Sequence, residues 1–213
     1  MSSGKTPPEV AAGYDRVARE YAGLEGAEEW PRMRWLQDLS ARLDGRSRVL
    51  DLGCGNGVPV ARELAQRHDV LGVDISERQI DWARESVPEA TFRVADAAEL
   101  DFEPASFDAI VSLYMLGHVP RSEHAALLER MRAWLRPGGY LLLSVEEEDD
   151  PDNVREWLGT PMFFSSFAAD QVLAVLESIG FQVVQEEASV QLEGSDEVSF
   201  RWILAQRSAA TEG

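Results

Sequence analysis

Glycine recurs at every second position in the middle of VLDLGCGNGVPVAREL, which runs from Val49 to Leu64. An apolar run leads into Gly53, Gly55 and Gly57, and an amphipathic stretch leads out of them. Between a strand and a helix, glycine serves a tight turn, a close approach of backbone to ligand, or close helix–strand contact. Free N–H groups at a helix start also suit an anionic group such as a carboxylate. The segment therefore predicts a nucleotide-like ligand, with a tight turn that binds nothing as the alternative.

Three aspartates lie at the ends of the expected strands and could hold such a ligand. Asp51 precedes the glycines, Asp74 ends VLGVD, and Asp96 ends the strand in FRVADAAEL. Because ligands of doubly wound sheets bind at the carboxyl ends of the strands, Asp74 is placed to accept hydrogen bonds from both hydroxyls of a ribose. Asp96 is placed to reach an adenine edge. Asp51 would repel a pyrophosphate but suits the amino group of an amino-acid tail, so the pattern disfavours a dinucleotide.

Alternating strands and helices must position these residues. Apolar runs predict strands at 48–52, 70–73, 91–94, 109–113, 140–145, 181–190 and 198–206. Helical spacing predicts helices at 58–67, 77–86, 122–135 and 168–179, after a first N-terminal helix and a second at 30–43 with Met33, Leu36, Leu39 and Leu43 inward. This rhythm predicts an α/β fold with a doubly wound, mostly parallel sheet covered on both faces. Only EGSD separates the last two strands, so we expect them to form an antiparallel hairpin.

One domain is expected, because 213 residues suit a single buried core. Its parts are a helical cap at 9–44, a ligand-binding core at 45–145, a lid loop at 146–170, and a helix with a hairpin at 171–207. The first eight residues and the last six or so are expected to be frayed ends.

Five segments resemble the class I S-adenosylmethionine-dependent methyltransferases of the small-molecule type. They are VLDLGCGNG, VLGVDIS, VADAAEL, FDAIVSLYMLGHV and LRPGGYLLLS, in the family's order and spacing, and they cover roughly residues 45–145. The family's sheet has seven strands in the order 3-2-1-4-5-7-6 with strand 7 antiparallel, which agrees with the hairpin. The resemblance implies S-adenosylmethionine as cofactor, S-adenosylhomocysteine as its product, and a small molecule as methyl acceptor.

The resemblance also implies which residues hold the cofactor. They are Asp51, Gly53, Cys54 and Gly55 around the methionine part, Asp74 on the ribose, Ile75 against the adenine, Asp96 and the Ala97 backbone at the adenine amine, Leu113 beside the sulfonium, and Tyr14 and Tyr21 over the cofactor from the first helix. Core packing is the alternative for the two tyrosines. Gly57 would permit contact with the helix. A thiol beside a helix start can have a lowered pKa, but GCG is common in this family without thiol chemistry, so none is expected of Cys54.

His118 is the candidate general base. Methyl transfer is an in-line displacement at an activated carbon, so positioning and desolvation supply much of the lowering of the barrier. A base is needed only where the acceptor must lose a proton. His118 follows the fourth strand, in a loop that faces the transferred methyl group in this fold, and histidine titrates in the useful range. The alternative is that His118 caps the following helix; His68 and His124 are expected to be structural.

The acceptor pocket is expected between the cap and the lid loop, where EWLGTPMFFSSFAAD is rich in aromatic residues. Apolar walls with few polar anchors are typical of small-molecule sites. The candidates are Trp30, Met33, Arg34, His118, Glu146, Trp157, Phe163 and Phe164. Ordinary core packing is the alternative for the phenylalanines, and a solvated surface for Glu146. The acceptor is therefore predicted to be small and partly apolar or aromatic, with oxygen, nitrogen, sulfur or carbon left open as the methylated atom.

The composition limits the partners. A net charge of −18 argues against nucleic acid and anionic membranes, because binding polyanions needs clustered Lys and Arg. No apolar run is long enough for a membrane span, and MSSGKTPPEV has no apolar core of a secretory signal. One cysteine excludes an internal disulfide framework and a cysteine-built zinc site. A cytoplasmic monomer or homodimer without a metal is expected.

Other functions remain open on the sequence alone. A nicotinamide dehydrogenase would need room for a pyrophosphate, which Asp51 opposes. A methyltransferase acting on protein, or an S-adenosylmethionine-binding protein without methyl transfer, would share the same cofactor motifs. A tRNA methyltransferase is disfavoured by the missing basic surface, and members of the family with other chemistry share the fold.

Overall fold

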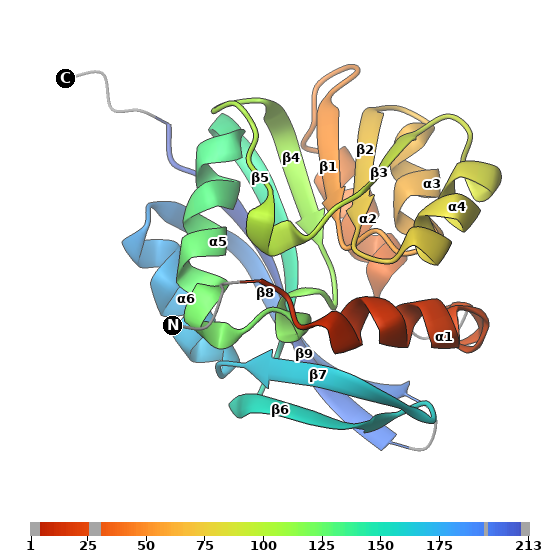
Figure 1. Cartoon of the computed structure of the whole chain (residues 1–213). Helices are drawn as coiled ribbons and strands as arrows, with labels where there is room; N and C mark the ends of the chain where they lie inside the picture. The colour runs from red at the N-terminus through yellow and green to blue at the C-terminus, as the bar shows by residue number, and fades with distance from the viewer. Residues whose placement is uncertain (1–4, 26–30, 194–195, 210–213) are drawn as a thin grey trace.

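A seven-stranded sheet forms the centre of the computed structural model, which describes residues 5–25, 31–193 and 196–209 (Figure 1). Its strands are β1 (Arg48–Leu52), β2 (Asp69–Asp74), β3 (Thr91–Val94), β4 (Phe107–Ser112), β5 (Leu135–Glu146), β8 (Phe181–Glu193) and β9 (Asp196–Arg207). They lie in the order β3-β2-β1-β4-β5-β9-β8. β9 is antiparallel to both of its neighbours, and the other pairs are parallel. Counted along the chain within this sheet, the order is 3-2-1-4-5-7-6, so the expected α/β fold is confirmed.

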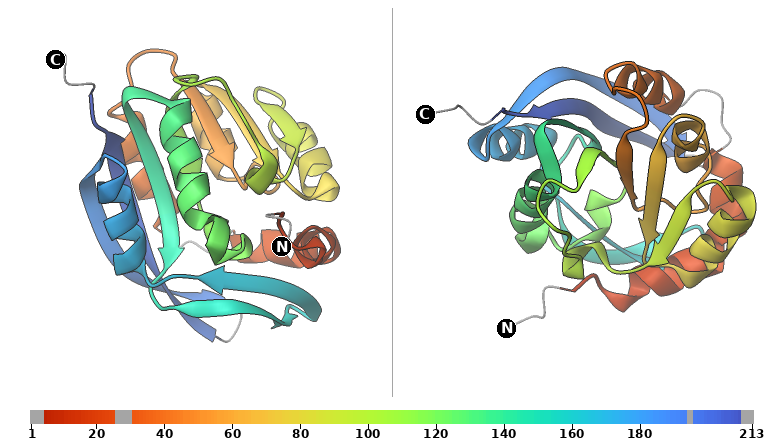
Figure 2. Two further views of the ribbon diagram at one scale, coloured as in Figure 1. Left: turned by 60° about the vertical axis from the view of Figure 1, so that its left-hand side comes forward. Right: turned by 90° about the horizontal axis from the view of Figure 1, so that it is seen from above.

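Helices cover both faces of the sheet (Figure 2). α2 (Arg32–Ser40), α3 (Val60–Ala65) and α4 (Glu77–Ser86) pack on one face, and α5 (Arg121–Trp134) and α6 (Ala169–Ser178) on the other. Strands buried on both faces must be apolar almost throughout, and β1 shows this in Val49, Leu50 and Leu52, which are fully buried. The sheet is therefore a rigid platform for the side chains that follow its strands.

Leu36, Leu39 and Leu43 are buried as the sequence predicts, but the first turn of the second N-terminal helix departs from the prediction. Met33, expected inward, is 37% exposed, while Arg32 and Trp35 are buried. Trp35 stacks on Trp202 of β9, with ring centres 6.1 Å apart and planes 14° from parallel. Since a tryptophan pair buries far more apolar area than a methionine, this contact determines which face of α2 meets the sheet.

The carboxyl edge of the central strands is covered by α1 (Pro8–Glu25) and by two short 3₁₀ turns. The turns are η1 (Ala97–Glu99) after β3 and η2 (Leu116–His118) after β4. α1 crosses below this edge and packs against α4 and against β7 (Thr160–Ser166), as Figure 1 shows. α1 thus lies across the place where a ligand of this fold class binds.

The segment expected as a lid loop is a β-hairpin, so that prediction is wrong in its secondary structure. β6 (Asp150–Trp157) and β7 pair antiparallel in a separate two-stranded sheet. The two connecting residues, Leu158 and Gly159, have φ of 48° and 72°. Positive φ at both central residues is the geometry that matches the twist of a two-residue hairpin. Glycine is the usual residue at these turn positions. Because leucine stands at the first of them, the sequence did not predict the turn.

Within the described residues, no helix is both long enough and apolar enough to cross a membrane.

Candidate functional site

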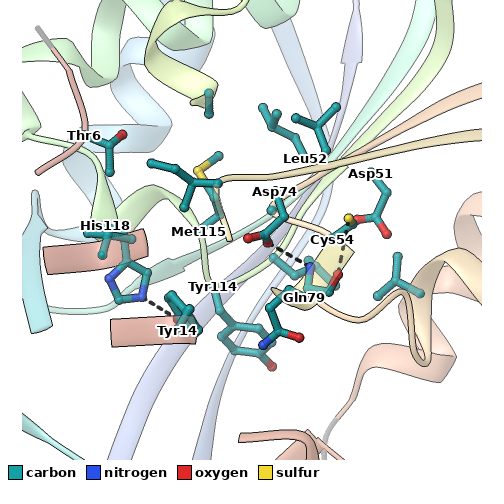
Figure 3. A pocket seen from close by; sticks show the side chains of 18 of the residues that line it. Thr6, Tyr14, Asp51, Leu52, Cys54, Asp74, Gln79, Tyr114, Met115 and His118 are labelled. Carbon is teal, nitrogen blue, oxygen red and sulfur yellow. Dashed lines mark hydrogen bonds between the residues drawn. The ribbon is translucent and has the colours of Figure 1, made fainter. Parts of the chain in front are cut away.

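A pocket opens between the carboxyl ends of β1, β2 and β4 and the helix α1 (Figure 3). It encloses about 820 Å³ of empty space when its open mouth is included. Ten of the predicted cofactor residues line it, together with His118: Tyr14, Asp51, Gly53, Cys54, Gly55, Asp74, Ile75, Asp96, Ala97 and Leu113. Tyr21 lies in α1, where the structure does not describe its side chain.

The glycine loop turns in the left-handed region at each of its glycines. Gly53, Gly55 and Gly57 have φ of 81°, 52° and 76°. A Cβ on Gly53 would lie 2.5 Å from Cγ of Met115, while a Cβ on Gly55 would meet nothing within 4 Å. A Cβ on Gly57 would press on Phe92 of β3 rather than on the following helix. The loop therefore leaves space at Gly55, and the Gly57 carbonyl accepts a hydrogen bond from the Arg62 N–H of the following helix at 2.9 Å.

The helix after the loop is shorter than predicted. α3 begins at Val60 and has six residues, whereas the pattern predicted a start at residue 58 and an end at 67. So short a helix offers little dipole to an anion. The negative end of a ligand must therefore be held by other groups that line the pocket.

Asp74 is held in place by the backbone around it. Its Oδ2 accepts a hydrogen bond from the Gly55 N–H at 2.9 Å, and its Oδ1 accepts one from the Ser76 N–H at 2.9 Å. Burial raises the pKa of Asp74, whereas these backbone donors lower it. A carboxylate has about four acceptor positions, so these backbone contacts fix the orientation of Asp74 and leave it able to accept from a ligand's hydroxyl groups.

Asp96 is engaged by the N-terminal segment. Its Oδ2 accepts from the Thr6 N–H at 2.9 Å, and its Oδ1 accepts from Thr6 Oγ1 at 2.6 Å and from the Ala98 N–H at 2.9 Å. Lys5 forms an ion pair with Glu99 beside it. The expectation that the first eight residues fray is therefore wrong from Lys5 onward, and Thr6 becomes a pocket residue.

Arg32 is a pocket residue that the sequence analysis missed. It is 3% exposed, and its guanidinium carbon lies 4.6 Å from the centre of the Tyr114 ring. Tyr114 has φ of 57°, and its hydroxyl donates to Oε1 of Gln191 at 2.9 Å. A guanidinium stays charged at all ordinary pH values, so Arg32 brings positive charge into the pocket. The sequence did not indicate that Arg32 faces the pocket; the packing of α2 in the structure shows it.

Tyr14 and His118 meet on the opposite side of the pocket from Asp51 and Asp74 (Figure 3). The Tyr14 hydroxyl lies 2.7 Å from Nε2 of His118, and Nδ1 of His118 lies 2.9 Å from the Phe163 carbonyl oxygen. Burial, with a smaller contribution from the positive charge of Arg155, lowers the pKa of His118 to about 4, although the hydrogen bond to the Phe163 carbonyl opposes this shift. His118 is therefore neutral at pH 7 and, at 8% exposed, still lines the pocket.

The remaining acceptor candidates that the structure describes do not line this pocket. Trp157, Phe163 and Phe164 form a small apolar cluster with Val10 and Met162. Arg34 pairs with Glu187 at 2.7 Å on the surface. Trp30 lies outside the described residues, and Met33 is exposed.

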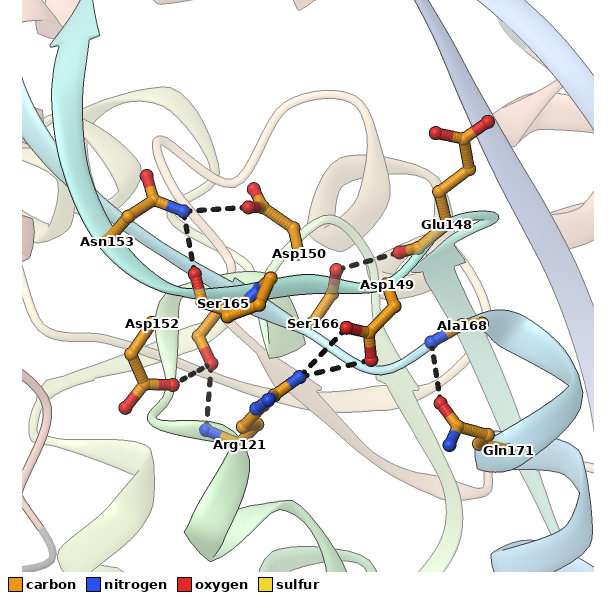
Figure 4. A network of polar contacts seen from close by, with 11 residues as sticks. Arg121, Glu148, Asp149, Asp150, Asp152, Asn153, Ser165, Ser166, Ala168 and Gln171 are labelled. Atoms are coloured by element: carbon orange, nitrogen blue, oxygen red, sulfur yellow. Dashed lines mark hydrogen bonds and ion pairs between the residues drawn. The ribbon is translucent and has the colours of Figure 1, made fainter.

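Glu146 and the acids after it lie beside the site rather than in it. The Glu146 carboxylate packs against the Gly117 backbone, where it would clash with any Cβ. Farther along the chain, Arg121 pairs with Asp149, and Ser165 donates to Asp152 at 2.6 Å (Figure 4). These contacts fix the connection between β5 and the hairpin.

α1 is anchored on both flanks of the pocket. Ser76 Oγ donates to Asp15 of α1 at 2.5 Å, and Arg16 donates to Thr160 of β7 at 3.0 Å. Ser76 also caps α4, accepting a bond from the Gln79 N–H. Asp15 and Arg16 directly follow Tyr14 in α1. The contacts of these two residues to α4 and to the hairpin therefore position the Tyr14 hydroxyl.

His68 and His124 lie away from the pocket, as predicted for structural residues. Nε2 of His68 lies 2.9 Å from Ser40 Oγ, and Nε2 of His124 lies 2.9 Å from the Val119 carbonyl oxygen. Cys54 is a free thiol that donates weakly to the Gly55 carbonyl at 3.5 Å.

A sequence profile described as a methyltransferase domain matches residues 21–186. The 27-O-demethylrifamycin SV methyltransferase of Amycolatopsis mediterranei (strain S699) is 31% identical, over 91% of this chain and 78% of that protein. The ubiquinone biosynthesis O-methyltransferase of Bordetella avium (strain 197N) is 35% identical, over 53% of this chain and 48% of that one.

Among solved structures, the 1,6-didemethyltoxoflavin-N1-methyltransferase of Burkholderia thailandensis superposes with a TM-score of 0.65. It is 22% identical, and the match covers 95% of this chain and 92% of that one. That structure holds 1,6-didemethyltoxoflavin and S-adenosylhomocysteine. At this identity the likeness supports the fold.

Proposed function

The chain belongs to the class I S-adenosylmethionine-dependent methyltransferases, and from that premise we propose that it methylates a hydroxyl oxygen of a small, partly apolar or aromatic molecule. Its relatives at 31% and 35% identity are named for transfer to oxygen. A hydroxyl must lose its proton during the transfer, and a neutral histidine lines the pocket. These two facts together support oxygen as the acceptor atom.

The residues of the pocket fit S-adenosylmethionine, which supplies a methyl group on a sulfonium when bound. Asp74 offers oriented carboxylate oxygens to the ribose hydroxyls. Asp96 has about one acceptor position beyond its three donors for the adenine amine. Arg32 suits the carboxylate of the amino-acid tail, and Asp51 suits its ammonium group. The opposite charges of these two residues match a zwitterion.

The protein's part in the reaction is to position, to exclude water and to take a proton. α1 lies over the pocket and shields it from bulk water, which strengthens charge interactions inside. Holding acceptor and methyl donor in line accounts for much of the rate, since well-oriented groups gain about 7–11 kcal/mol. His118 is the base that holds the proton released by the reaction.

The observation that carries the proposal is that one pocket joins Asp74, Asp96 and His118. The first two suit a nucleoside, and the third suits a proton leaving the acceptor. A net charge of −18 supports a small acceptor over a nucleic acid. We place the reaction in the reducing cytoplasm, consistent with a lone free thiol.

A matched acceptor screen tests the proposal. Purified protein is incubated with S-adenosylmethionine and three sets of aromatic and alicyclic compounds that share a skeleton but carry a hydroxyl, an amine or a thiol. Formation of S-adenosylhomocysteine is followed by mass spectrometry. We expect turnover in the hydroxyl set and none with the O-methylated counterparts. Turnover confined to amines or thiols, or methylation of added protein alone, would contradict the proposed acceptor.

A further inference from the structure

A hydrogen-bond chain with a fixed direction runs from the hairpin to α1. It joins the Phe163 carbonyl, the imidazole of His118 and the hydroxyl of Tyr14. A carbonyl oxygen only accepts, so Nδ1 of His118 must carry the hydrogen at this contact of 2.9 Å. In a neutral imidazole the other nitrogen is then an acceptor, so the Tyr14 hydroxyl donates to Nε2 across 2.7 Å.

The direction of the chain determines what the pocket offers a ligand. Because the Tyr14 hydrogen is directed at His118, the Tyr14 oxygen acts toward a ligand as an acceptor. The lone pair of His118 Nε2 is already engaged by that hydroxyl. Tyr14 and His118 both line the pocket, and their rings meet edge to face with centres 5.2 Å apart. An acceptor's hydroxyl therefore finds Tyr14 before it finds the histidine nitrogen.

We propose that Tyr14 is the catalytic residue that touches the acceptor's reacting hydroxyl, and that the proton passes through Tyr14 to His118. This inference rests on the proposed function. The Tyr14 oxygen, as a hydrogen-bond acceptor, would favour substrates that donate a hydrogen at the atom to be methylated.

The relay balances in atoms and charge. The carbon–sulfur bond of the sulfonium breaks as the carbon–oxygen bond of the product forms. The acceptor's O–H proton goes to Tyr14 Oη while the phenol's own proton goes to His118 Nε2. The sulfonium loses one positive charge and the imidazole gains one, so the pocket's net charge is unchanged. The imidazolium then releases its proton to water.

The surroundings support this order of groups. Burial favours the neutral imidazole in the resting protein, which keeps Nε2 an acceptor. The Phe163 carbonyl stabilises the ring when it becomes charged, because a hydrogen bond from an imidazolium to a carbonyl is stronger than one from a neutral ring. Asp15 and Arg16, which directly follow Tyr14, anchor α1 to Ser76 and to Thr160 of the hairpin. Their contacts hold the phenol at the histidine.

Nitrogen NMR on ¹⁵N-histidine-labelled protein bound to S-adenosylhomocysteine tests the chain directly. The protein has three histidines, and His118→Gln identifies the signal of His118. We expect the Nδ1–H tautomer at pH 7, with an Nε2 shift that changes in Tyr14→Phe while the tautomer persists. An Nε2–H tautomer would reverse the chain and overturn the proposal, whatever the acceptor is.

Kinetics on a hydroxyl compound from the acceptor screen test the relay. We expect Tyr14→Phe to lower kcat by about 10²-fold or more, and to change the affinity for S-adenosylhomocysteine by less than about threefold. His118→Gln should lower kcat similarly, and the double variant should be no slower than the slower single one, because the two groups act as one unit. Thr160→Val separates positioning from proton transfer: it removes the anchor of Arg16 but leaves the Tyr14 hydroxyl, so it should lower kcat by less than Tyr14→Phe does.

Three other outcomes of these experiments would each contradict one part of the proposal. If Tyr14→Phe keeps most of its kcat while His118→Gln loses it, His118 acts directly and the relay is wrong. If Thr160→Val loses as much as Tyr14→Phe, the tyrosine only helps to dock α1. If the Nδ1–H tautomer is found but no hydroxyl compound is methylated, the proposed function is wrong, and so is the relay that rests on it. The direction of the hydrogen-bond chain is then still correct.

Discussion

The guanidinium of Arg32 lies over the ring of Tyr114, 4.6 Å from its centre, and both side chains line the pocket. Stacking on an aromatic face orients a guanidinium and leaves its N–H groups to point along the ring plane. Arginine suits carboxylates because its planar fork can bind both oxygens. The pair therefore suits the carboxylate end of the cofactor.

Arg32→Met should weaken S-adenosylhomocysteine binding by about 10- to 100-fold, the size of one charged hydrogen-bonding partner. The matched ligand is 5′-methylthioadenosine, which keeps the nucleoside and lacks the amino-acid tail. Its affinity should be nearly the same in the wild type and the variant. Titration calorimetry measures both. An equal loss for the two ligands would show that Arg32 supports the fold of the pocket and not the tail.

Thr6 and the adenine are expected to share Asp96 and not to compete for it. The carboxylate has about four acceptor positions, and three are filled by Thr6 and Ala98. Thr6→Val removes the hydroxyl donor and keeps the shape, so S-adenosylhomocysteine should bind about two- to tenfold more weakly as the N-terminal segment loosens. Tighter binding in calorimetry would mean that Thr6 occupies the adenine's place and must leave it.

His118 should make the protein less stable as the pH falls. Its pKa is about 4 in the folded protein and 6.5 when unfolded, so the unfolded chain binds more protons between these values. Stability contributed by the neutral ring is present above pH 6.5 and is lost as the pH falls toward 4, amounting to about 3 kcal/mol.

Urea unfolding at pH 7.0, 5.5 and 4.5 checks this effect in the wild type and His118→Gln. The pKa values of His68 and His124 are also lowered, and that of Asp74 is raised, so all three contribute to both proteins. The difference between the two proteins therefore isolates His118. The wild type should lose more stability on acidification than the variant. Equal losses would mean that the imidazole titrates near its ordinary pKa.

The strand ends were predictable because the signal there is local. Asp51 and Asp74 lie in the last two positions of β1 and β2, and Asp96 lies two residues after β3. Their positions at the strand ends could therefore be placed beside the pocket from the sequence alone. The hairpin of β8 and β9 followed in the same way from a short polar connection. Such patterns depend on neighbours along the chain.

The rest depended on partners far away in the sequence. Arg32 turns inward because Trp35 stacks on Trp202, and no local pattern in α2 reveals a partner in β9. Thr6 is ordered by Asp96, 90 residues away. The hairpin of β6 and β7 was missed because Leu158 adopts a positive φ that its type does not announce. Phe163, expected in the acceptor pocket, instead packs with Val10 and presents its carbonyl to His118.

Measuring the contact between Asp74 and the ribose tests the site most directly, because the placement of every other group on the cofactor depends on this contact. S-adenosylhomocysteine and its 2′,3′-dideoxy analogue are titrated calorimetrically into the wild type and Asp74→Asn. We predict that the wild type prefers the ribose form by about 10- to 100-fold and that the variant loses most of this preference, because the carboxylate accepts the ribose hydroxyls. Equal binding of both ligands by the wild type would remove Asp74 from the ribose and contradict the cofactor's placement in this pocket.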